Sequence, residues 1–147
     1  MKKLLILLLL ALPLLTACGA SKSAFKGAAP ADSDLLARRF VLQSVNGEAF
    51  NAGERRPEIE FSEGMRVTGQ VCNRFIGNGA YEKGVLTVPN MAMTMMLCVD
   101  DKLNQLERDF AAMLREGARV GLQKNILTLS DGKITLVYVR SDVPAER

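Results

Sequence analysis

Histidine is absent from this chain of 147 residues, and so are several short motifs that carry common enzyme chemistry. Without histidine there is no imidazole base, no Ser-His-Asp arrangement and no histidine-ligated zinc site. The sequence also lacks a Cys-x-x-Cys pair, a phosphate-binding loop and a complete Gly-x-Gly-x-x-Gly motif. Gly77-Asn78-Gly79 has no third glycine and suits a turn. We therefore predict a protein that is not an enzyme and holds no cofactor.

A hydrophobic run long enough to cross a membrane is also lacking. The apolar stretch 4–15 has 12 residues and contains Pro13, whereas a membrane-spanning helix needs about 20. Because Lys2 and Lys3 precede this stretch, residues 1–17 are predicted to be a cleaved signal peptide.

The signal segment ends in Leu15-Thr16-Ala17-Cys18, the pattern of a bacterial lipoprotein. The Cys18 thiol is predicted to carry a diacylglycerol. Each buried acyl CH₂ contributes about 0.8 kcal/mol, so two or three chains hold a protein permanently at a membrane. Gly19 stands where an inner-membrane retention signal usually has Asp, which predicts anchoring at the periplasmic face of the outer membrane. The alternative is an ordinary signal peptide with an incidental cysteine.

A strong excess of charge is lacking as well. The precursor has a net charge of +3, and removing 1–17 with its two lysines leaves +1 on 130 residues. This length predicts a single domain, and the near-neutral charge gives no electrostatic case for binding nucleic acid. We expect a monomer that contacts the membrane through its N-terminal lipid.

Two cysteines remain after Cys18, namely Cys72 and Cys98. An even pair in an exported protein favours a disulfide. Closing a loop of 27 residues would stabilise the fold by about 3.5 kcal/mol through chain entropy. The alternative is two buried free thiols.

The pattern along the chain predicts a flexible tether over 18–37, a folded domain over 38–140 and a C-terminal tail over 141–147. A helix is expected to begin at Asp100 or Asp101 and to end at Gly117. The predicted strands are 40–45, 58–61, 65–71, 80–82, 85–88, 118–122, 126–129 and 134–139. About eight short strands and one late helix indicate an α+β fold, a mostly antiparallel sheet that curls like a barrel with the helix at its open end.

Glu58 and Glu60 lie on one face of a predicted strand, with Glu63 nearby. Paired carboxylates can do acid–base work in a hydrolase, but a solvated strand face is the simpler account. Arg74, beside Asn73, could reach an anionic group at a turn, although such an arginine more often pairs with a local carboxylate or carbonyl.

A soft-ligand cluster runs from Met91 to Cys98 and includes Met93, Met95 and Met96. Thioethers and a thiolate suit Cu(I). Methionine is also an adaptable filler of cores, and an oxidised Cys98 would have no thiolate. We therefore predict that these methionines pack in the core, with a copper site as the alternative.

The stretches 39–47, 66–77 with Cys72-Asn73-Arg74-Phe75, and 91–98 together resemble the META-domain family. The resemblance extends from about Arg38 to Val139. It implies a conical antiparallel barrel with a helix at one end, paired positions for the two cysteines and a turn at 73–75. It also implies an envelope protein connected with stress and tolerance of some antibiotics, and it supplies no catalytic residues.

These observations lead to one functional prediction, an outer-membrane lipoprotein that acts by binding an envelope component without catalysis. The alternatives are Cu(I) handling by the cluster 91–98 and carriage or piloting of a hydrophobic partner. A methionine-lined interior of the barrel could admit an acyl chain or a peptide, provided that the barrel is hollow.

Overall fold

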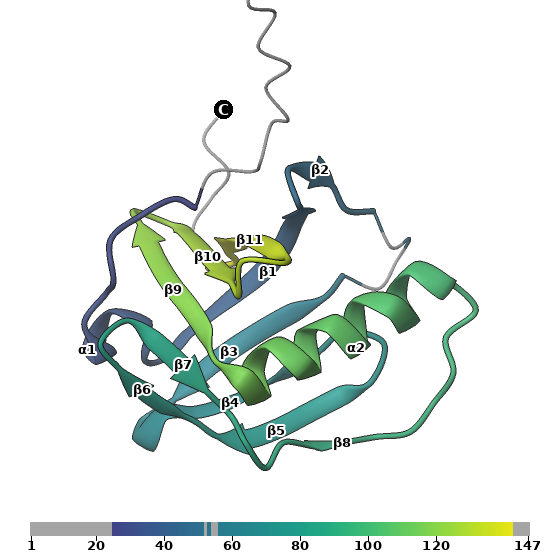
Figure 1. The fold of residues 1–147 in the computed structure, drawn as a ribbon, viewed down its shortest axis with the longest axis horizontal. Coiled ribbons are helices and arrows are strands. Elements are labelled where there is room, and N and C mark those ends of the chain that lie inside the picture. Colours follow the sequence, from purple (N-terminus) through teal and green to yellow (C-terminus); the bar gives the residue numbers. More distant parts are fainter. Residues whose placement is uncertain (1–24, 52, 54–55, 143–147) are drawn as a thin grey trace, which may run out of the picture.

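A computed structural model describes residues 25–51, 53 and 56–142 (Figure 1). Its helices are α1 (Asp32–Leu35) and α2 (Asp101–Glu116), and a short 3-10 turn covers Glu63–Met65. The strands are β1 (Arg38–Val45), β2 (Glu48–Ala49), β3 (Glu58–Ser62), β4 (Arg66–Gln70), β5 (Arg74–Asn78), β6 (Ala80–Glu82), β7 (Val85–Thr87), β8 (Ala92–Met93), β9 (Ala118–Gln123), β10 (Ile126–Ser130) and β11 (Thr135–Arg140).

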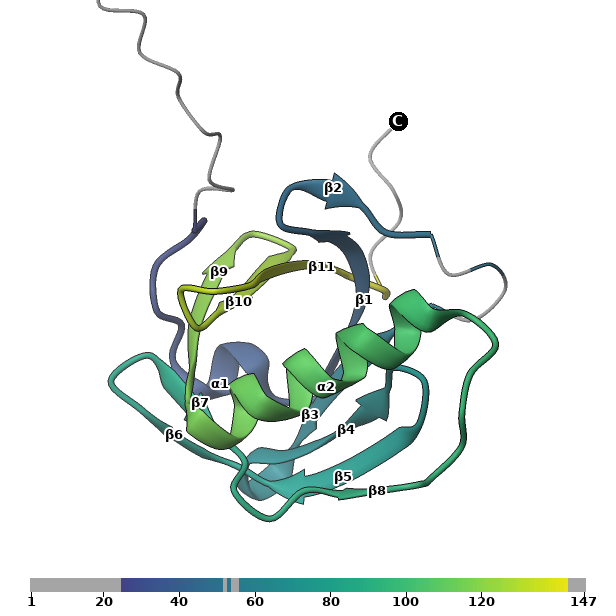
Figure 2. The ribbon, with the colours of Figure 1, turned by 45° about the vertical axis from the view of Figure 1, so that its right-hand side comes forward.

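The strands form one antiparallel sheet in the order β6-β7-β9-β10-β11-β1-β3-β4-β5-β8, with β2 paired to β1. The sheet curls into a half-barrel, and α2 crosses its open side (Figure 2). The predicted α+β class is confirmed. The described residues contain eleven strands rather than about eight, because β5 and the two-residue strands β2 and β8 give weak or turn-like sequence signals.

Most elements form where the hydrophobic periodicity predicts them. In β3, Ile59 and Phe61 are buried while the alternate residues face solvent, which is the period of two of a strand with one face in the core. Helix α2 buries residues at three- and four-residue spacing. It begins where the Asp100 side chain accepts a hydrogen bond from Lys102 N at 2.9 Å and ends at Gly117, whose φ is +125°.

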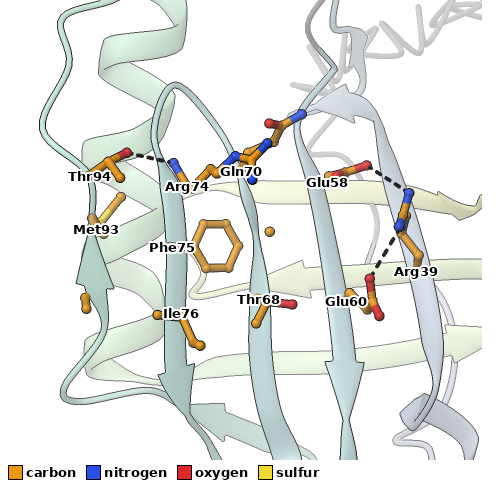
Figure 3. A pocket seen from close by; sticks show the side chains of 12 residues that line it. Arg39, Glu58, Glu60, Thr68, Gln70, Arg74, Phe75, Ile76, Met93 and Thr94 are labelled. Atoms are coloured by element: carbon orange, nitrogen blue, oxygen red, sulfur yellow. Dashed lines mark hydrogen bonds and ion pairs between the residues drawn. The ribbon is translucent and has the colours of Figure 1, made fainter.

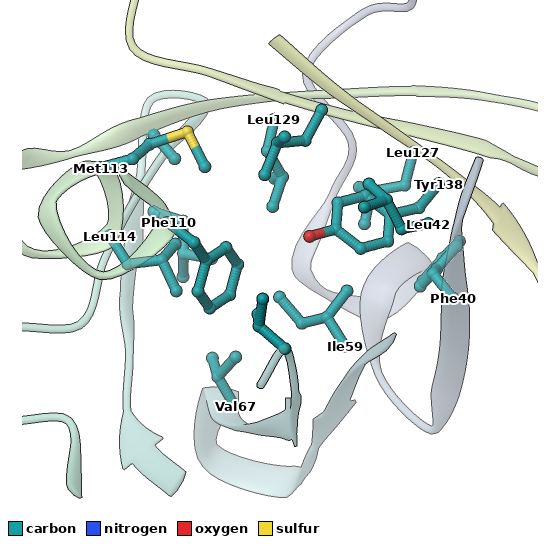
Figure 4. Packing of buried hydrophobic residues seen from close by; sticks show 14 of the residues in the cluster. Phe40, Leu42, Ile59, Val67, Phe110, Met113, Leu114, Leu127, Leu129 and Tyr138 are labelled. Carbon is teal, nitrogen blue, oxygen red and sulfur yellow. The ribbon is translucent and has the colours of Figure 1, made fainter. Parts of the chain in front are cut away.

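The interior of the half-barrel is filled by side chains (Figure 4). Phe110 from α2 packs on Phe75 from β5 with ring centroids 5.0 Å apart, and Tyr138 is buried among aliphatic residues. The buried methionines of this described core are Met65 and Met113, not those of the cluster 91–98. The structure therefore gives no support to a hollow, methionine-lined barrel as a carrier site.

Strand β5 corrects the turns expected at 73–75 and 77–79 over residues 74–78, whereas Asn73 lies in a bend and Gly79 follows the strand. Phe75 and Gly77 alternate on the buried face of a strand that pairs with both β4 and β8. A side chain at Gly77 would lie 2.4 Å from Val88 Cγ1, so this glycine permits close packing against the 85–88 segment. A glycine required by packing resembles a turn signal when only the sequence is considered.

The described part of the predicted tether, 25–37, packs against the barrel. Leu35 in α1 is fully buried, and Leu122 N donates a hydrogen bond to Ala28 O at 2.9 Å. Gly121 leaves space for this segment, since a Cβ there would approach Lys26 O to 2.3 Å. The flexible-tether prediction therefore does not hold for 25–37.

Both ends of the chain extend beyond the described residues. The predicted signal peptide 1–17, Cys18 and the rest of the tether to residue 24 lie outside them, as do 143–147. Within the described ranges, no helix has the length and apolar character needed to cross a bilayer.

Phe25 provides a test of how the N-terminal segment docks. Its ring lies under Arg119, whose Cζ is 4.5 Å from the ring centroid. Phe25→Ala is expected to lower the free energy of unfolding by about 1 kcal/mol and to raise hydrogen exchange at the Leu122 amide. Lys26→Ala, which truncates an exposed neighbour, should change neither quantity. Unchanged exchange at Leu122 in the Phe25 variant would argue against the docked segment.

Candidate functional site

A groove of about 660 Å³ lies on the outer face of the sheet, over β1, β3, β4, β5 and β8 (Figure 3). It gathers several residues that the sequence analysis treated as candidates for chemistry. The lining residues are Arg39, Glu58, Glu60, Thr68, Gly69, Gln70, Arg74, Phe75, Ile76, Ala92, Met93 and Thr94. Glu63 does not line the groove and lies in the 3-10 turn before β4.

The two carboxylates of the groove share one guanidinium. Arg39 Nε lies 3.4 Å from Glu60 Oε2, and Arg39 Nη1 lies 3.9 Å from Glu58 Oε2. All three side chains are partly exposed to solvent. The arrangement is a solvated strand face, as the simpler of the two predictions had it, with the carboxylates ion-paired to Arg39. Among the residues that the structure describes, no further acid–base group lies between the two carboxylates.

Arg74 enters the same groove from β5, on the opposite side from Arg39. Its backbone N–H donates a hydrogen bond to Thr94 Oγ1 at 3.1 Å. Within the described residues its guanidinium has no carboxylate within 4.0 Å. The local ion pair considered for Arg74 is therefore not formed, and the cation remains at the surface of the groove.

Gly69 determines how close the floor of the groove is to the core. A side chain at this position would come within 2.1 Å of Glu58 O and 2.7 Å of Phe75 Cζ. Glycine therefore lets the Phe75 ring lie directly against β4 at the floor of the groove.

Beside the groove, a disulfide joins Cys72, in the β4–β5 connection, to Cys98, in the segment between β8 and α2, with Cα atoms 5.9 Å apart. Both sulfurs are thus engaged with each other, and Cys98 offers no thiolate to a metal ion. Among the described residues, no group of three or more His, Cys, Asp or Glu side chains is placed to hold a metal. The copper alternative consequently loses its strongest ligand.

Asn73 is the centre of a buried hydrogen-bond network next to this disulfide, and it is 3% exposed. Its Nδ2 donates to Glu107 Oε1 at 2.7 Å and to Met96 O at 3.0 Å. Its Oδ1 accepts from Met96 N at 2.7 Å and from Thr94 Oγ1 at 3.0 Å. One side chain therefore joins the β4–β5 connection, the segment after β8 and helix α2.

Asn104 repeats this arrangement one turn into α2. Its Oδ1 accepts from Cys98 N at 3.0 Å, and its Nδ2 donates to Cys98 O at 2.8 Å. Asn104 and Glu107 were given no role by the sequence patterns. The available signal was an asparagine on the apolar face of a predicted helix, where a polar side chain needs a buried partner.

The methionines of the cluster 91–98 separate into two groups. Met91 and Met93 are partly buried and pack against the core. Met95 and Met96 are 97% and 57% exposed, and Leu97 beside them is 87% exposed. The prediction of core packing is wrong for Met95 and Met96, because Asn73 and the disulfide fasten this segment to the surface of the domain.

An antiparallel half-barrel closed by one helix, with a cysteine pair linking the β4–β5 connection to the segment before that helix, defines a known class of domain. A family model described as META domain matches residues 33–143, and the chain belongs to this family.

Among curated proteins, the chain is similar to Heat shock protein HslJ of Escherichia coli (strain K12). The two are 46% identical over 105 residues, which cover 71% of this chain and 75% of HslJ. Solved structures agree with the fold. One structure determined by NMR is 43% identical, with a TM-score of 0.72 over 77% of this chain and 97% of its own. A second NMR structure, of a protein from Burkholderia xenovorans, is 20% identical with a TM-score of 0.60, covers 82% of this chain and 97% of its own, and shows the fold alone.

Proposed function

We propose that this protein is a heat-shock-related lipoprotein at the periplasmic face of the outer membrane, where it binds an envelope component without catalysis. The observation that carries the proposal is the lipid-attachment pattern Leu15-Thr16-Ala17-Cys18 directly after a short apolar run. The similarity to Heat shock protein HslJ supports the connection with stress. Tolerance of some antibiotics, which the family resemblance implies, would then follow from a role in envelope maintenance.

The docking of 25–37 on the barrel gives this anchor a short reach. From Cys18 to Phe25 there are seven residue steps, which span at most about 25 Å when fully extended. The sequence pattern predicted that the folded part starts near Arg38, which allowed a longer tether. With the shorter reach, the domain would work on components at or near the membrane surface.

A role in binding agrees with the surface chemistry. The carboxylates of the groove are paired with Arg39, whereas Arg74 and an apolar segment after β8 are presented to solvent. Exposed apolar groups that lie next to one another are typical of interaction sites. The interior is filled, so contact through the surface is better supported than carriage of a ligand inside the barrel.

The anchoring proposal predicts a complete change of compartment for Cys18→Ser. The native protein should incorporate a labelled fatty acid and sediment with membranes, whereas the variant should incorporate none and appear in the soluble periplasmic fraction. Ser23→Ala, in the same segment, should behave as the native protein does. A native protein that takes up no fatty acid, or a serine variant that still sediments with membranes, would refute the lipid anchor.

Gly19→Asp tests the particular membrane. If the outer membrane is the address, this change should move the protein to the inner-membrane fraction of a density gradient while fatty-acid labelling persists. A native protein that already bands with the inner membrane would show that the outer-membrane assignment is wrong, even if Cys18 is acylated.

A further inference from the structure

Strand β8 ends the sheet order, and it pairs with β5 through Phe75↔Met93 and Ile76↔Ala92. No described strand lies on the other side of β8. The chain continues past Met93 through 94–99 before α2 begins. An unpaired edge of this kind offers free main-chain donors and acceptors to another strand.

The even-numbered residues of this segment fasten it to the domain. Thr94 N donates to Arg74 O at 3.0 Å, which extends the pairing with β5 by one residue. Beyond it, the main-chain N–H of Met96 donates to Asn73 Oδ1, and its C=O accepts from Asn73 Nδ2. Cys98 forms the same pair of hydrogen bonds with the side-chain amide of Asn104. Two side-chain amides thus take the place of a neighbouring strand along the inner edge.

The odd-numbered residues face away from the domain. Met95, Leu97 and Val99 are 97%, 87% and 104% exposed, and within the described chain their main-chain N–H and C=O groups form no hydrogen bond. The stretch 94–98 is neither helical nor part of a described strand, and it leads into a bend at Val99. Because Met96 and Cys98 direct their main-chain groups toward the domain, the residues between them direct theirs to the opposite edge, as in an extended chain. We name Met95, Leu97 and Val99, with their outward main-chain groups, the free edge.

We propose that the free edge binds an extended segment of a partner protein as an added strand, with apolar side chains at alternate positions of that segment. Main-chain hydrogen bonds would supply affinity, and the row of apolar side chains would supply selectivity, as in other cases where a peptide extends a sheet. The proposal rests on the binding role proposed above and names the class of partner.

Two other occupants fit the observations less well. A bilayer would cover the apolar side chains but leave the outward N–H and C=O groups without partners. The position of 94–99 also argues against a bilayer as the occupant. The N-terminal segment 25–37, which leads toward Cys18, lies on the opposite side of the domain (Figures 1 and 2). The other occupant is a second copy of this chain. A dimer formed through three side chains from each copy would bury far less than the roughly 1,200 Å² of a stable dimer.

The test uses the full chain with Cys18→Ser, which carries no lipid whether or not the native protein does. The probe is a pool of synthetic heptapeptides in which valine, leucine, isoleucine or phenylalanine alternates with threonine between terminal lysines. Binding is followed by NMR, with hydrogen exchange measured at the single amides of 94–99. Because the experiment is independent of acylation, its failure and a failure of the fractionation experiment are distinguishable.

The expected result has an alternating signature. On peptide binding, exchange at the amides of Met95, Leu97 and Val99 should slow at least about tenfold, since each gains a main-chain partner. The amides of Met96 and Cys98 are already bonded and should change little. The same peptides with N-methyl groups at the positions that face the edge should bind at least about tenfold more weakly.

A matched pair of variants locates the site. Met95→Ser, Leu97→Ser and Val99→Ser together should weaken peptide binding at least about tenfold without changing the melting temperature, because these side chains are exposed. Val85→Ser, at an exposed apolar position in β7 near the opposite end of the sheet order, should leave binding unchanged.

Four outcomes would overturn the proposal. These are no slowing of exchange at the free edge with peptide up to about 1 mM, equal binding of the N-methylated peptides, self-association of the free chain that the triple serine variant abolishes, and binding to phosphatidylethanolamine–phosphatidylglycerol vesicles that depends on the same three residues.

Discussion

Replacing Asn73 by alanine is expected to lower the free energy of unfolding by about 4 kcal/mol. The side chain makes four hydrogen bonds while 3% exposed, one of them to the Glu107 carboxylate. Alanine removes all four and leaves buried partners unsatisfied, and each unsatisfied group costs more than the average worth of a bond. The measurement is chemical denaturation followed by circular dichroism.

The same variant should also loosen the segment after β8. Met96 loses both of its main-chain partners, so its amide should exchange at least about tenfold faster while amides in β10 and β11 keep their relative protection. Asn78→Ala provides the matched control, since Asn78 is an exposed asparagine at the end of the strand that follows Asn73, β5, and it should change stability by less than about 0.5 kcal/mol. An Asn73 variant as stable as the Asn78 variant would contradict the role of the network.

Replacing both Cys72 and Cys98 by alanine is expected to lower stability by about 3.5 kcal/mol. The bond closes a loop between residues 26 positions apart, and its removal gives the unfolded chain more conformations. The denaturant m-value should rise, because a chain without the crosslink exposes more surface on unfolding. The effect of the disulfide should not add simply to that of Asn73, since both fasten the same segment.

The pairing itself is checked by counting thiols in denaturant. With Cys18 replaced by serine, the oxidised protein should show no free thiol, and a reductant should lower its midpoint of unfolding toward that of the double alanine variant. The alanine variant should not respond to reductant. Two free thiols in freshly purified protein would support the alternative of unpaired buried cysteines.

The helix and most strands could be predicted because their signals are local. Leu103, Leu106 and Phe110 recur at helical spacing, with a capping aspartate before them, and Ile59 and Phe61 alternate with glutamates. These periods follow from backbone geometry, so they need no knowledge of the tertiary structure. Strand β5 could not be predicted in this way. Its Gly77 is required by the close approach of Val88, a residue on another segment.

The remaining differences also depend on distant partners. The segment 25–37 has the composition of a linker, and it packs only because Gly121 leaves room for it. Met95 and Leu97 have the hydrophobicity of core residues, and they are exposed because Asn73 and Asn104 hold the neighbouring residues from the other side. A hydrophobic pattern predicts which residues favour burial, but not which of them find a core to enter.

The alternation along 94–99 has a consequence for how the protein could evolve. Folding depends on one set of positions, 94, 96 and 98, through the asparagine amides and the disulfide. The interleaved positions 95, 97 and 99 contribute little to the core, so mutations there are nearly free of selection for stability. Paralogues could therefore acquire different partners by drifting at three solvent-facing positions while inheriting an unchanged scaffold.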